Sequence, residues 1–439
     1  MSRPGYHTLT LGCKLNRFDS AAVEAELERR GYAPEPDLSA AAVVVVNTCA
    51  VTGKADAEAR RLVRRVRRAN PACRLLVTGC YAELDAGAIL GLRIADRVFG
   101  NRDKPRLKEI LDEMGVGREA APVAEAVPRY DHAPGRRFGN RGRAFLKIQE
   151  GCDLACAYCV IPRVRGRSRS VPKESVERDF LARAAAGYRE IVLTGVNTGA
   201  FGHDLAPRLA LEELVRSLLR VAGPVRIRLN SLEPLTVTDG LLRIMSDDPR
   251  LAPHVQVPLQ SGSDEILRSM RRNYRTSQYL ERVSALREAV PDAAIGADVI
   301  VGFPGETDAR FEETLRFVER SPLNYLHVFA WSPRPGVPAA SLPGRPHGGA
   351  VAERSRRLRE VGERKFLEFR RRFEGRELDA VLLGGRRDDG RWRALTGNFI
   401  EAAVAGEGLE PRHLVRVRVV RAERSETLAV AEGLPNWAG

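Results

Sequence analysis

Hydrophobic runs alternate with segments of helical spacing in the first part of the chain. The run at 40–48, AAAVVVVNT, is rich in β-branched residues and is typical of a strand buried on both faces. Shorter runs at 6–12 and 73–79 predict two more strands, and the apolar spacing at 18–32 and 55–70 predicts helices. Because strands that alternate with helices form parallel sheets, we expect an N-terminal α/β domain of the Rossmann or flavodoxin type.

The same alternation returns at residue 144. Six hydrophobic segments predict strands, at 144–150, 190–195, 226–232, 254–259, 294–302 and 325–332. Helical segments lie between them, and a longer helix is expected at 351–374. These units predict a partial (β/α)6 barrel of the TIM type, open on one side, with its chemistry at the carboxyl ends of the strands.

The pattern changes again after Gly375, where short segments alternate in hydrophobicity from residue to residue. Closely spaced strands of this kind predict a small antiparallel β-barrel. The sequence therefore predicts an α/β multidomain protein. We expect an N-terminal domain at 1–128, a linker rich in Pro, Gly and charge at 129–142, the partial barrel at 143–370 and the small barrel at 371–439.

Composition indicates the compartment and the kind of partner. The 439 residues are 44% hydrophobic and 29% charged, and no apolar run approaches the roughly 20 residues that a membrane helix needs. The N-terminus has no apolar secretory signal, so we expect a cytoplasmic protein with no membrane partner. The net charge of +14 predicts a polyanionic partner such as nucleic acid, although an arginine-rich composition alone would give the same charge.

The cysteines indicate metal binding or catalysis. There are 7 of them, all before residue 160, and in a reducing compartment disulfides are rare. Cys13, Cys49 and Cys80 each follow a predicted strand, and the carboxyl ends of parallel strands meet at one edge of a sheet. We therefore expect these three side chains to converge there, with ordinary core cysteines as the alternative.

A second group follows the first strand of the partial barrel. Cys152, Cys156 and Cys159 have the spacing C-x3-C-x2-C. A structural zinc site fills four ligand positions, whereas three thiolates on a cubane cluster leave the fourth iron open. We interpret the loop as the site of an iron–sulfur cluster with one open iron. A closed zinc site and three incidental cysteines are the alternatives.

A cysteine loop of this spacing, after the first strand of a six-unit barrel, resembles the radical S-adenosylmethionine (SAM) superfamily. The stretches LGCKLN, VNTCAVT and VTGCY resemble the N-terminal domain of its methylthiotransferase family. VPLQSGSDEILRSMRRNY and DVIVGFPGET resemble the radical SAM core of that family, and the tail resembles a TRAM domain, an OB-like barrel that binds RNA. The resemblance extends over nearly the whole chain.

The resemblance implies two 4Fe–4S clusters and SAM as cofactors. In the superfamily the open iron chelates SAM, and an electron from the cluster cleaves it to methionine and a 5′-deoxyadenosyl radical. The resemblance assigns the second cluster to Cys13, Cys49 and Cys80. It also implies tRNA rather than DNA as the partner, an electron donor of the flavodoxin or ferredoxin type, and a source of sulfur.

The resemblance also implies SAM contacts at the cysteine loop and after the barrel strands. Tyr158 matches the position that contacts the adenine, with a simple packing aromatic as the alternative. Residues after the second strand match those that hold the SAM amino group, and residues after the third and fourth match those near the ribose and the methionyl end. The implied contacts are Tyr158, Thr194, Gly195, Asn197, Ser231, Glu233 and Gln260. For Glu233 a solvated surface position is the alternative.

Arginines follow the cysteine loop in PRVRGRSRS (162–170) and recur in VRVRVVR (415–421). A basic run beside an active centre is expected to contact the SAM carboxylate or RNA phosphates, whereas most charge runs are solvated faces. The expected RNA contacts are Arg163, Arg165, Arg167, Arg416 and Arg418. No residue beyond the cluster ligands is assigned a catalytic role.

Within the family, GCKLNRFDS and RGRSRS are most similar to the enzymes that act on threonylcarbamoyladenosine in tRNA. The expected reaction adds sulfur and a methyl group to C2 of this adenosine at position 37, next to the anticodon. That carbon is neither nucleophilic nor acidic, so a radical from the cofactor is needed. Enzymes acting on isopentenyladenosine usually read GCQMN at the first motif, and those acting on a ribosomal protein read GCPKN. Both substrates are alternatives, as is a non-catalytic protein that binds zinc and RNA.

Overall fold

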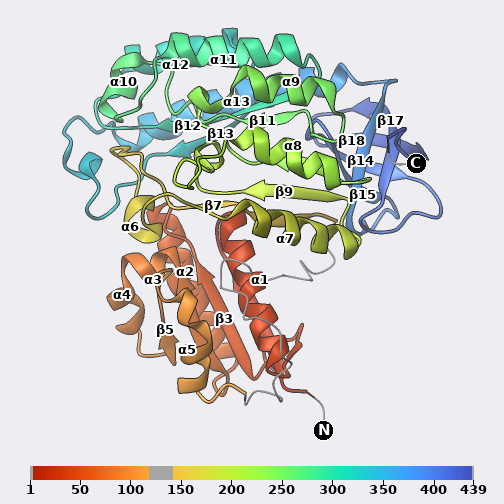
Figure 1. Cartoon of the computed structure of the whole chain (residues 1–439). Coiled ribbons are helices and arrows are strands. Elements are labelled where there is room, and N and C mark those ends of the chain that lie inside the picture. Colours follow the sequence, from red (N-terminus) through yellow and green to blue (C-terminus); the bar gives the residue numbers. More distant parts are fainter. Residues whose placement is uncertain (1–2, 118–141, 438–439) are drawn as a thin grey trace.

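The computed structural model describes residues 3–117 and 142–437. Figure 1 shows an N-terminal α/β part in red and orange, a larger α/β part in yellow to light blue, and a small barrel in blue. The expected fold class is confirmed, because parallel α/β parts are followed by a closed β-barrel. Apart from Gly142, the predicted linker at 129–142 lies outside the described residues.

The N-terminal part is a five-stranded parallel sheet with the strand order β2-β1-β3-β4-β5. Its strands are β1 (Gly5–Thr10), β2 (Ala33–Pro34), β3 (Val43–Thr48), β4 (Arg74–Gly79) and β5 (Arg97–Val98). Its helices are α1 (Lys14–Arg29), α2 (Gly53–Ala69), α3 (Cys80–Leu84), α4 (Ala86–Leu90), the 3-10 turn η1 (Lys104–Arg106) and α5 (Leu107–Glu113). Helix α1 begins at Lys14 rather than at residue 18, because the extended Cys13 is its N-cap residue.

Strand β3 is buried on both faces, as its β-branched run predicts. Val44 and Val46 pack with Val63 of α2, while Val43 and Val45 belong to a separate cluster on the other face of the sheet, with helices α1 and α5. The four valines are at most 1% exposed. The sheet is therefore fixed between two helical layers, and the loops after its strands are available for a site.

The larger part is the predicted partial barrel. Its strands are β6 (Ala144–Lys147), β9 (Glu190–Thr194), β10 (Arg226–Leu229), β11 (His254–Gln256), β12 (Ala294–Val301) and β13 (Tyr325–Ala330). They form two parallel sheets, β10-β9-β6 and β11-β12-β13, with a parallel bridge between Ile227 and Leu251. Its helices are α7 (Lys173–Ala185), α8 (Leu211–Val221), α9 (Asp239–Asp247), α10 (Asp264–Ser269), α11 (Thr276–Ala289), α12 (Asp308–Arg320) and α13 (Gly348–Arg371). In the described ranges no helix is long and apolar enough to span a bilayer.

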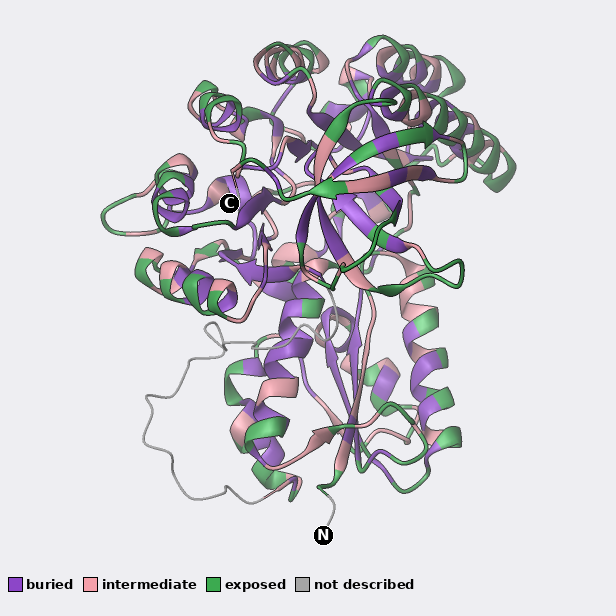
Figure 2. Ribbon diagram, turned by 90° about the vertical axis from the view of Figure 1, so that its right-hand side faces the viewer, coloured by how far each residue is buried: buried purple, intermediate pink, exposed green. Residues whose placement is uncertain are grey.

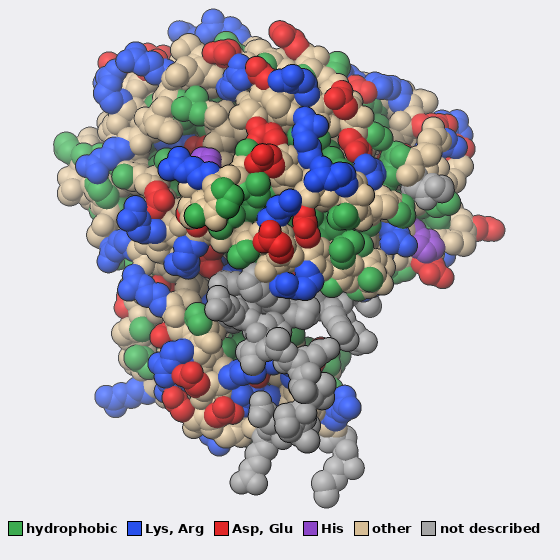
Figure 3. Space-filling model, in the orientation of Figure 1, with side chains coloured by type: hydrophobic (Ala, Val, Ile, Leu, Met, Phe, Trp, Pro, Cys, Tyr) green, Lys and Arg blue, Asp and Glu red, His purple; other side chains and the backbone are tan. Residues whose placement is uncertain are grey.

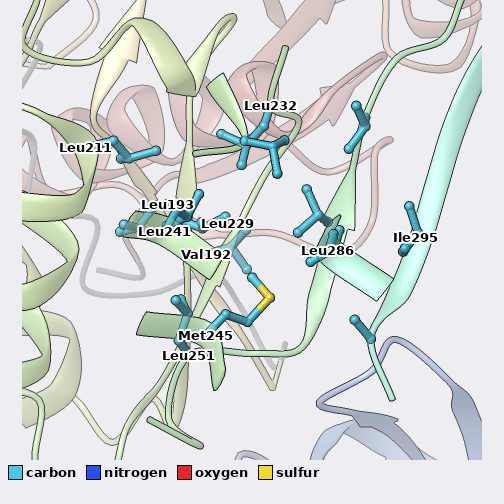
Figure 4. Close-up of a cluster of buried hydrophobic side chains, with 14 of the residues drawn as sticks. Val192, Leu193, Leu211, Leu229, Leu232, Leu241, Met245, Leu251, Leu286 and Ile295 are labelled. Carbon is cyan, nitrogen blue, oxygen red and sulfur yellow. The ribbon is translucent and has the colours of Figure 1, made fainter. Parts of the chain in front are cut away.

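The main hydrophobic core lies between the barrel strands and their helices. Figure 4 shows side chains of β9 and β10, such as Leu193 and Leu229, among Leu241, Met245 and Leu286 from the helical layer. Figure 2 shows the same division, with buried strands inside and exposed residues on the outer faces of the helices. Replacing a fully buried leucine here by alanine costs about 2–5 kcal/mol of stability.

The strand predicted at 144–150 is divided in two. After β6, the short strand β7 (Gln149–Glu150) pairs antiparallel with β8 (Arg169–Ser170), and the cysteine loop lies between them. Helix α6 (Ile161–Arg165) follows the loop. Val160 and Val164 belong to the hydrophobic cluster of the N-terminal part, so this segment packs with that part although it follows the first barrel strand.

The chain ends in a closed barrel with the strand order β14-β15-β16-β18-β17. Its strands are β14 (Glu377–Arg386), β15 (Trp392–Thr396), β16 (Glu401–Ala405), β17 (Leu414–Ala422) and β18 (Thr427–Gly433). All pairs are antiparallel except β16 with β18.

Two buried arginines of β10 hold the small barrel in place. Arg226 donates to the carbonyls of Asp379 and Leu395, and Arg228 donates to that of Gly397, each at 2.9 Å. Both guanidinium groups also pair with Glu190 of β9, at 2.7 and 2.9 Å. Because Glu190 and Arg226 begin their strands, the small barrel sits at the amino ends, away from the loops that follow the strands.

Candidate active site

Three cysteines lie together where strands β1, β3 and β4 end. Cys13 follows β1 after two residues, Cys49 follows β3 directly, and Cys80 begins α3 immediately after β4. Burial raises the pKa of Cys49 to about 12, and the nearby Cys80 and Cys13 add to this effect. Cys13 is exposed and the other two are buried. The first triad therefore has one open side.

Asn16 ties the loops of the first triad to one another. It is fully buried, and its amide nitrogen donates to the carbonyls of Leu11 at 2.8 Å and Thr48 at 2.9 Å. Its amide oxygen accepts from Arg165 at 2.6 Å and lies 3.8 Å from the Cys80 sulfur. Sequence reasoning missed this residue. The signal was present in the motif LGCKLN, where a polar residue stands at a position that helix α1 buries.

A buried charge network joins the N-terminal part to the barrel chain. Asp19 of α1 is 0% exposed and pairs with Lys104 and with Arg165 of α6. Arg165, 1% exposed in its side chain, also pairs with Glu150 at 2.7 Å. Burial alone would raise the pKa of Asp19, but Lys104 and Arg165 outweigh burial and lower it. Asp19 is therefore ionised in the protein interior, where it is paired with both cations.

This network corrects the expectation of an RNA contact at Arg165. Its guanidinium group is enclosed by Asn16, Asp19 and Glu150, so no RNA phosphate reaches it. Arg163 and Arg167 are exposed on either side of it. Arg163 and Arg165 are two positions apart on helix α6, so their side chains point in roughly opposite directions, and the sequence alone does not show which of them is buried.

The second triad lies in the loop after β7. The backbone N–H of Cys152 donates to the Gly166 carbonyl at 3.1 Å, and a Cβ at Gly151 would collide with the Arg167 carbonyl. Burial raises the pKa of Cys152, and it raises that of Cys159 to about 12 with the nearby Cys156 adding to it. The three thiols are thus neighbours on a loop held against the segment that follows it.

No three Cys, His, Asp or Glu side chains of the described residues stand close enough to ligate a single metal ion. In a cubane cluster each thiolate binds a different iron, so its ligands need not converge on one point. The two triads, which contain no disulfide, fit that donor set.

Arg272 bridges the second triad and the predicted SAM site, and sequence reasoning missed it. Its guanidinium group donates to the Cys156 sulfur at 3.1 Å and pairs with Glu233. It also lies over the Tyr274 ring, 4.8 Å from the centroid. The motif SMRRNY contained it, but nothing in the sequence separates it from the exposed Arg271 beside it.

Six of the seven predicted SAM contacts follow three barrel strands, and the seventh, Tyr158, lies in the cysteine loop. Thr194 ends β9 and is followed by Gly195 and Asn197; the others follow β10 and β11. Gly195 has no positive φ. A Cβ there would lie 2.9 Å from the Gln149 side-chain oxygen, so a larger residue would displace that side chain. The predicted contacts after β10 and β11 are Ser231, Glu233 and Gln260.

Gln149, another residue that the sequence did not single out, joins this loop to the cysteine loop. Its side-chain oxygen accepts from the backbone N–H groups of Val196 and Asn197, each at 3.0 Å. Its amide nitrogen donates to the Gly151 carbonyl at 2.7 Å. The buried side-chain oxygen of Asn197 has no hydrogen-bond partner among the described residues, so it is free to accept from a ligand.

Lys14 connects the two halves of the site. It follows Cys13, and its ammonium group donates to the side-chain oxygen of Asn230 at 2.7 Å, directly after β10. Burial, together with Arg143 and Arg228, lowers the pKa of Lys14 to about 8. The edge of the first triad therefore faces the carboxyl end of β10, where the predicted SAM contacts begin.

The remaining predicted RNA contacts are on the small barrel. Arg416 and Arg418 lie on β17 and pair with Glu377 at 3.2 Å and with Glu432 at 2.7 Å. Near the cysteine loop, Arg167 pairs with Asp153 at 3.3 Å. These ion pairs are at the surface, so each arginine can exchange its partner at little cost.

The fold and the cysteine loop define a radical SAM enzyme. Residues 146–318 match the radical SAM superfamily, and residues 5–100 match the uncharacterized protein family UPF0004. The radical SAM methyltransferase TsrM from Kitasatospora setae shares the fold, with a TM-score of 0.56 and 16% identity over 77% of this chain and 75% of that one. Membership implies a 4Fe–4S cluster and SAM as cofactors.

Relatives that align with nearly the whole chain show to which family of radical SAM enzymes it belongs. The threonylcarbamoyladenosine tRNA methylthiotransferases MtaB of Thermotoga maritima and Bacillus subtilis are 35% and 32% identical, over 94% and 96% of this chain and 94% of each relative. The tRNA-2-methylthio-N(6)-dimethylallyladenosine synthase of Thermobifida fusca is 36% identical over 95% of this chain and 87% of its own. The chain belongs to the radical SAM methylthiotransferase family, and the resemblance seen in its motifs is confirmed.

Proposed function

We propose that this enzyme transfers a methylthio group to C2 of N6-threonylcarbamoyladenosine at position 37 of tRNA, giving 2-methylthio-N6-threonylcarbamoyladenosine. The observation that carries the proposal is the contact between Lys14, next to Cys13, and Asn230, next to the predicted SAM contact Ser231. It joins the surroundings of the first triad to the end of β10, which supports a site shared by both triads. A reaction that needs a radical and a sulfur donor at the same carbon requires that arrangement.

In this proposal each triad holds one 4Fe–4S cluster. Cys152, Cys156 and Cys159 would hold the cluster that binds SAM, and the second would be held by the triad Cys13, Cys49 and Cys80. When bound, the cofactors supply the radical that removes the C2 hydrogen and the methylated sulfur that replaces it. The chain's own residues hold the ligand loops: Asn16 fixes the first, and Gln149 fixes the second.

The proposed SAM site fits a cationic amine. The unpartnered oxygen of Asn197 would accept from the SAM amino group. Glu233 is held by Arg272 and would accept from the ribose hydroxyls. The other proposed contacts are Tyr158, Thr194, Gly195, Ser231 and Gln260.

The positive charge of the chain supports the proposal that the protein binds RNA. Figure 3 shows Lys and Arg side chains on both the barrel and the N-terminal part, with Asp and Glu among them. The exposed Arg163 and Arg167 lie beside the cysteine loop, and Arg416 and Arg418 lie on the small barrel. Binding through such residues weakens as salt rises. An electron donor of the flavodoxin or ferredoxin type and a source of sulfur complete the proposal.

A second substrate deserves the same test because the Thermobifida fusca relative is named for dimethylallyladenosine. The reconstituted enzyme is incubated anaerobically with SAM, dithionite and tRNA carrying either modification, and the nucleosides are analysed by mass spectrometry. We expect the methylthio product from threonylcarbamoyladenosine. Formation of the methylthio product only from the dimethylallyl tRNA would identify dimethylallyladenosine as the substrate. Failure to form the product from either tRNA would disprove the proposed function.

A further inference from the structure

Lys14 reaches from the edge of the first triad to the end of strand β10, where its side-chain partner is the neutral Asn230. It begins helix α1 beside Cys13, and its ammonium group lies 2.7 Å from the side-chain oxygen of Asn230. The side chain is partly exposed. An ammonium group has three donors, and in the described residues one of them has an acceptor.

The other internal cations nearby already have carboxylate partners. Lys104 and Arg165 share Asp19, and Arg226 and Arg228 share Glu190. Among the described residues, no carboxylate lies within ion-pair distance of Lys14. Its ability to bind an anion is therefore unused in the protein alone.

The surrounding charge also favours an anion. Arg143 pairs with Glu190 at 3.4 Å, so three arginines share that single carboxylate. Arg143, Arg228 and Glu190 are all close enough to Lys14 to act on its charge. Lys14 and the three arginines thus lie around one buried carboxylate, with Glu401 acting in addition on Arg143 and Asp379 on Arg226. A carboxylate brought in by a ligand would balance part of this positive charge and would bind in a setting partly shielded from water.

The two candidate substrates differ in whether the group on N6 carries a carboxylate. The threonylcarbamoyl group carries the carboxylate of its threonine, whereas the dimethylallyl group is a hydrocarbon. Both are attached to N6 of an adenine, and only N1 separates C6 from the reacting C2. A group on N6 therefore lies beside the reacting carbon. Since Lys14 adjoins Cys13, a proposed ligand of the cluster that would supply the sulfur, the proposed function puts Lys14 near that group.

We propose that Lys14 is a specificity-determining residue, whose ammonium group binds the carboxylate of the threonylcarbamoyl group. Asn230 holds the ammonium group in position before the substrate arrives. The inference rests on the proposed function, since it names the residue that would recognise the threonylcarbamoyl group of the substrate proposed there. Dimethylallyladenosine would leave Lys14 without a counter-charge and would bind less tightly for that reason.

The test compares anticodon stem-loop RNAs that differ only at N6 of position 37: threonylcarbamoyl, its neutral carboxamide, and dimethylallyl. Dissociation constants are measured by fluorescence anisotropy with the reconstituted wild-type enzyme and with Lys14→Gln and Lys14→Arg. We expect the wild type to bind the carboxylate RNA about 10- to 100-fold more tightly than the carboxamide, the value of a charged hydrogen bond. Lys14→Gln removes that preference and Lys14→Arg retains most of it. Lys54→Gln, an exposed lysine of the same domain, leaves the ratio unchanged.

Iron content and 5′-deoxyadenosine formation are measured for each variant, because Lys14 adjoins a proposed ligand. Equal wild-type affinities for the carboxylate and carboxamide RNAs overturn the inference, whatever the variants do. So does a Lys14→Gln enzyme with full iron content and an unchanged preference. In both cases the wild type still forms the methylthio product from the threonylcarbamoyl RNA. Loss of that product in the wild type is instead the failure of the proposed function.

Discussion

Asp19 and Arg165, 146 residues apart in the sequence, form an ion pair of 3.0 Å whose side chains are 0% and 1% exposed. One residue lies on the helix that follows Cys13, and the other lies on the helix that follows the second triad. The pair therefore fixes the two cysteine loops relative to each other. Because it is buried, its loss has consequences that a surface ion pair would not have.

Replacing Asp19 by Asn should destabilise the protein by about 3–5 kcal/mol, since Lys104 would remain buried without its carboxylate and Arg165 would keep only Glu150. The measurement is urea denaturation. The matched control is Glu113→Gln, which breaks the half-exposed pair with Arg97 and should cost about 0–1 kcal/mol. Equal effects of the two substitutions would contradict the role given to the network.

The same carboxylate makes stability depend on acid. Burial would raise the pKa of Asp19, but Lys104 and Arg165 hold it below its ordinary value of about 4. The unfolded chain therefore takes up the proton first, so the stabilisation is complete above about pH 4 and is lost as the pH falls toward the folded pKa. The free energies of unfolding of the wild type and of Asp19→Asn should converge below that pH. A gap that stays constant in acid would disprove this.

Glu190 should be essential for attachment of the small barrel. Glu190→Gln leaves Arg226 and Arg228 without their counter-charge, and both arginines hold carbonyls of that barrel. We expect a loss of about 3–5 kcal/mol. Hydrogen exchange should show faster exchange across β14–β18 than in the N-terminal sheet. The control is Glu401→Gln, which breaks an exposed pair with Arg393. An equal increase in hydrogen exchange in that variant would rule out a specific role of Glu190 in holding the small barrel.

Arg272 should be required for SAM affinity. Lys at this position keeps the charge but loses the fork that contacts Cys156 and Glu233 together, so Glu233 would be less well oriented. Calorimetric titration of SAM into the reconstituted Arg272→Lys enzyme should show affinity lowered about 10- to 100-fold. The exposed neighbour Arg271→Lys should bind SAM like the wild type. Unchanged binding by Arg272→Lys would exclude a role in orienting Glu233.

Periodicity sufficed to predict the three-part fold, because β-branched runs such as Val43–Val46 are buried by any packing of a parallel sheet. The cysteine spacing and the strand ends also indicated where each triad would lie. The residues that hold the loops were not predictable. Asn16 and Gln149 act through contacts with backbone far away in the sequence, and their types are common in surface loops.

Arg165 and Arg272 illustrate the same limit for charge. Each stands beside a second arginine or in a basic run, and the sequence gives equal weight to every member. Only the packing of α6 and of the segment after α10 decides which guanidinium group becomes internal. Whether an arginine is internal or exposed depends on its burial. In short segments, hydrophobic periodicity does not predict that burial.

Helix α6 has a practical consequence for protein engineering. Val160 and Val164 complete the hydrophobic cluster of the N-terminal part, and Arg165 neutralises its internal carboxylate. Chimeras that exchange residues 3–117 alone between relatives would separate these residues from their partners. A transplant that keeps 3–117 together with 160–165 preserves the shared interior, and the crossover point should be chosen accordingly.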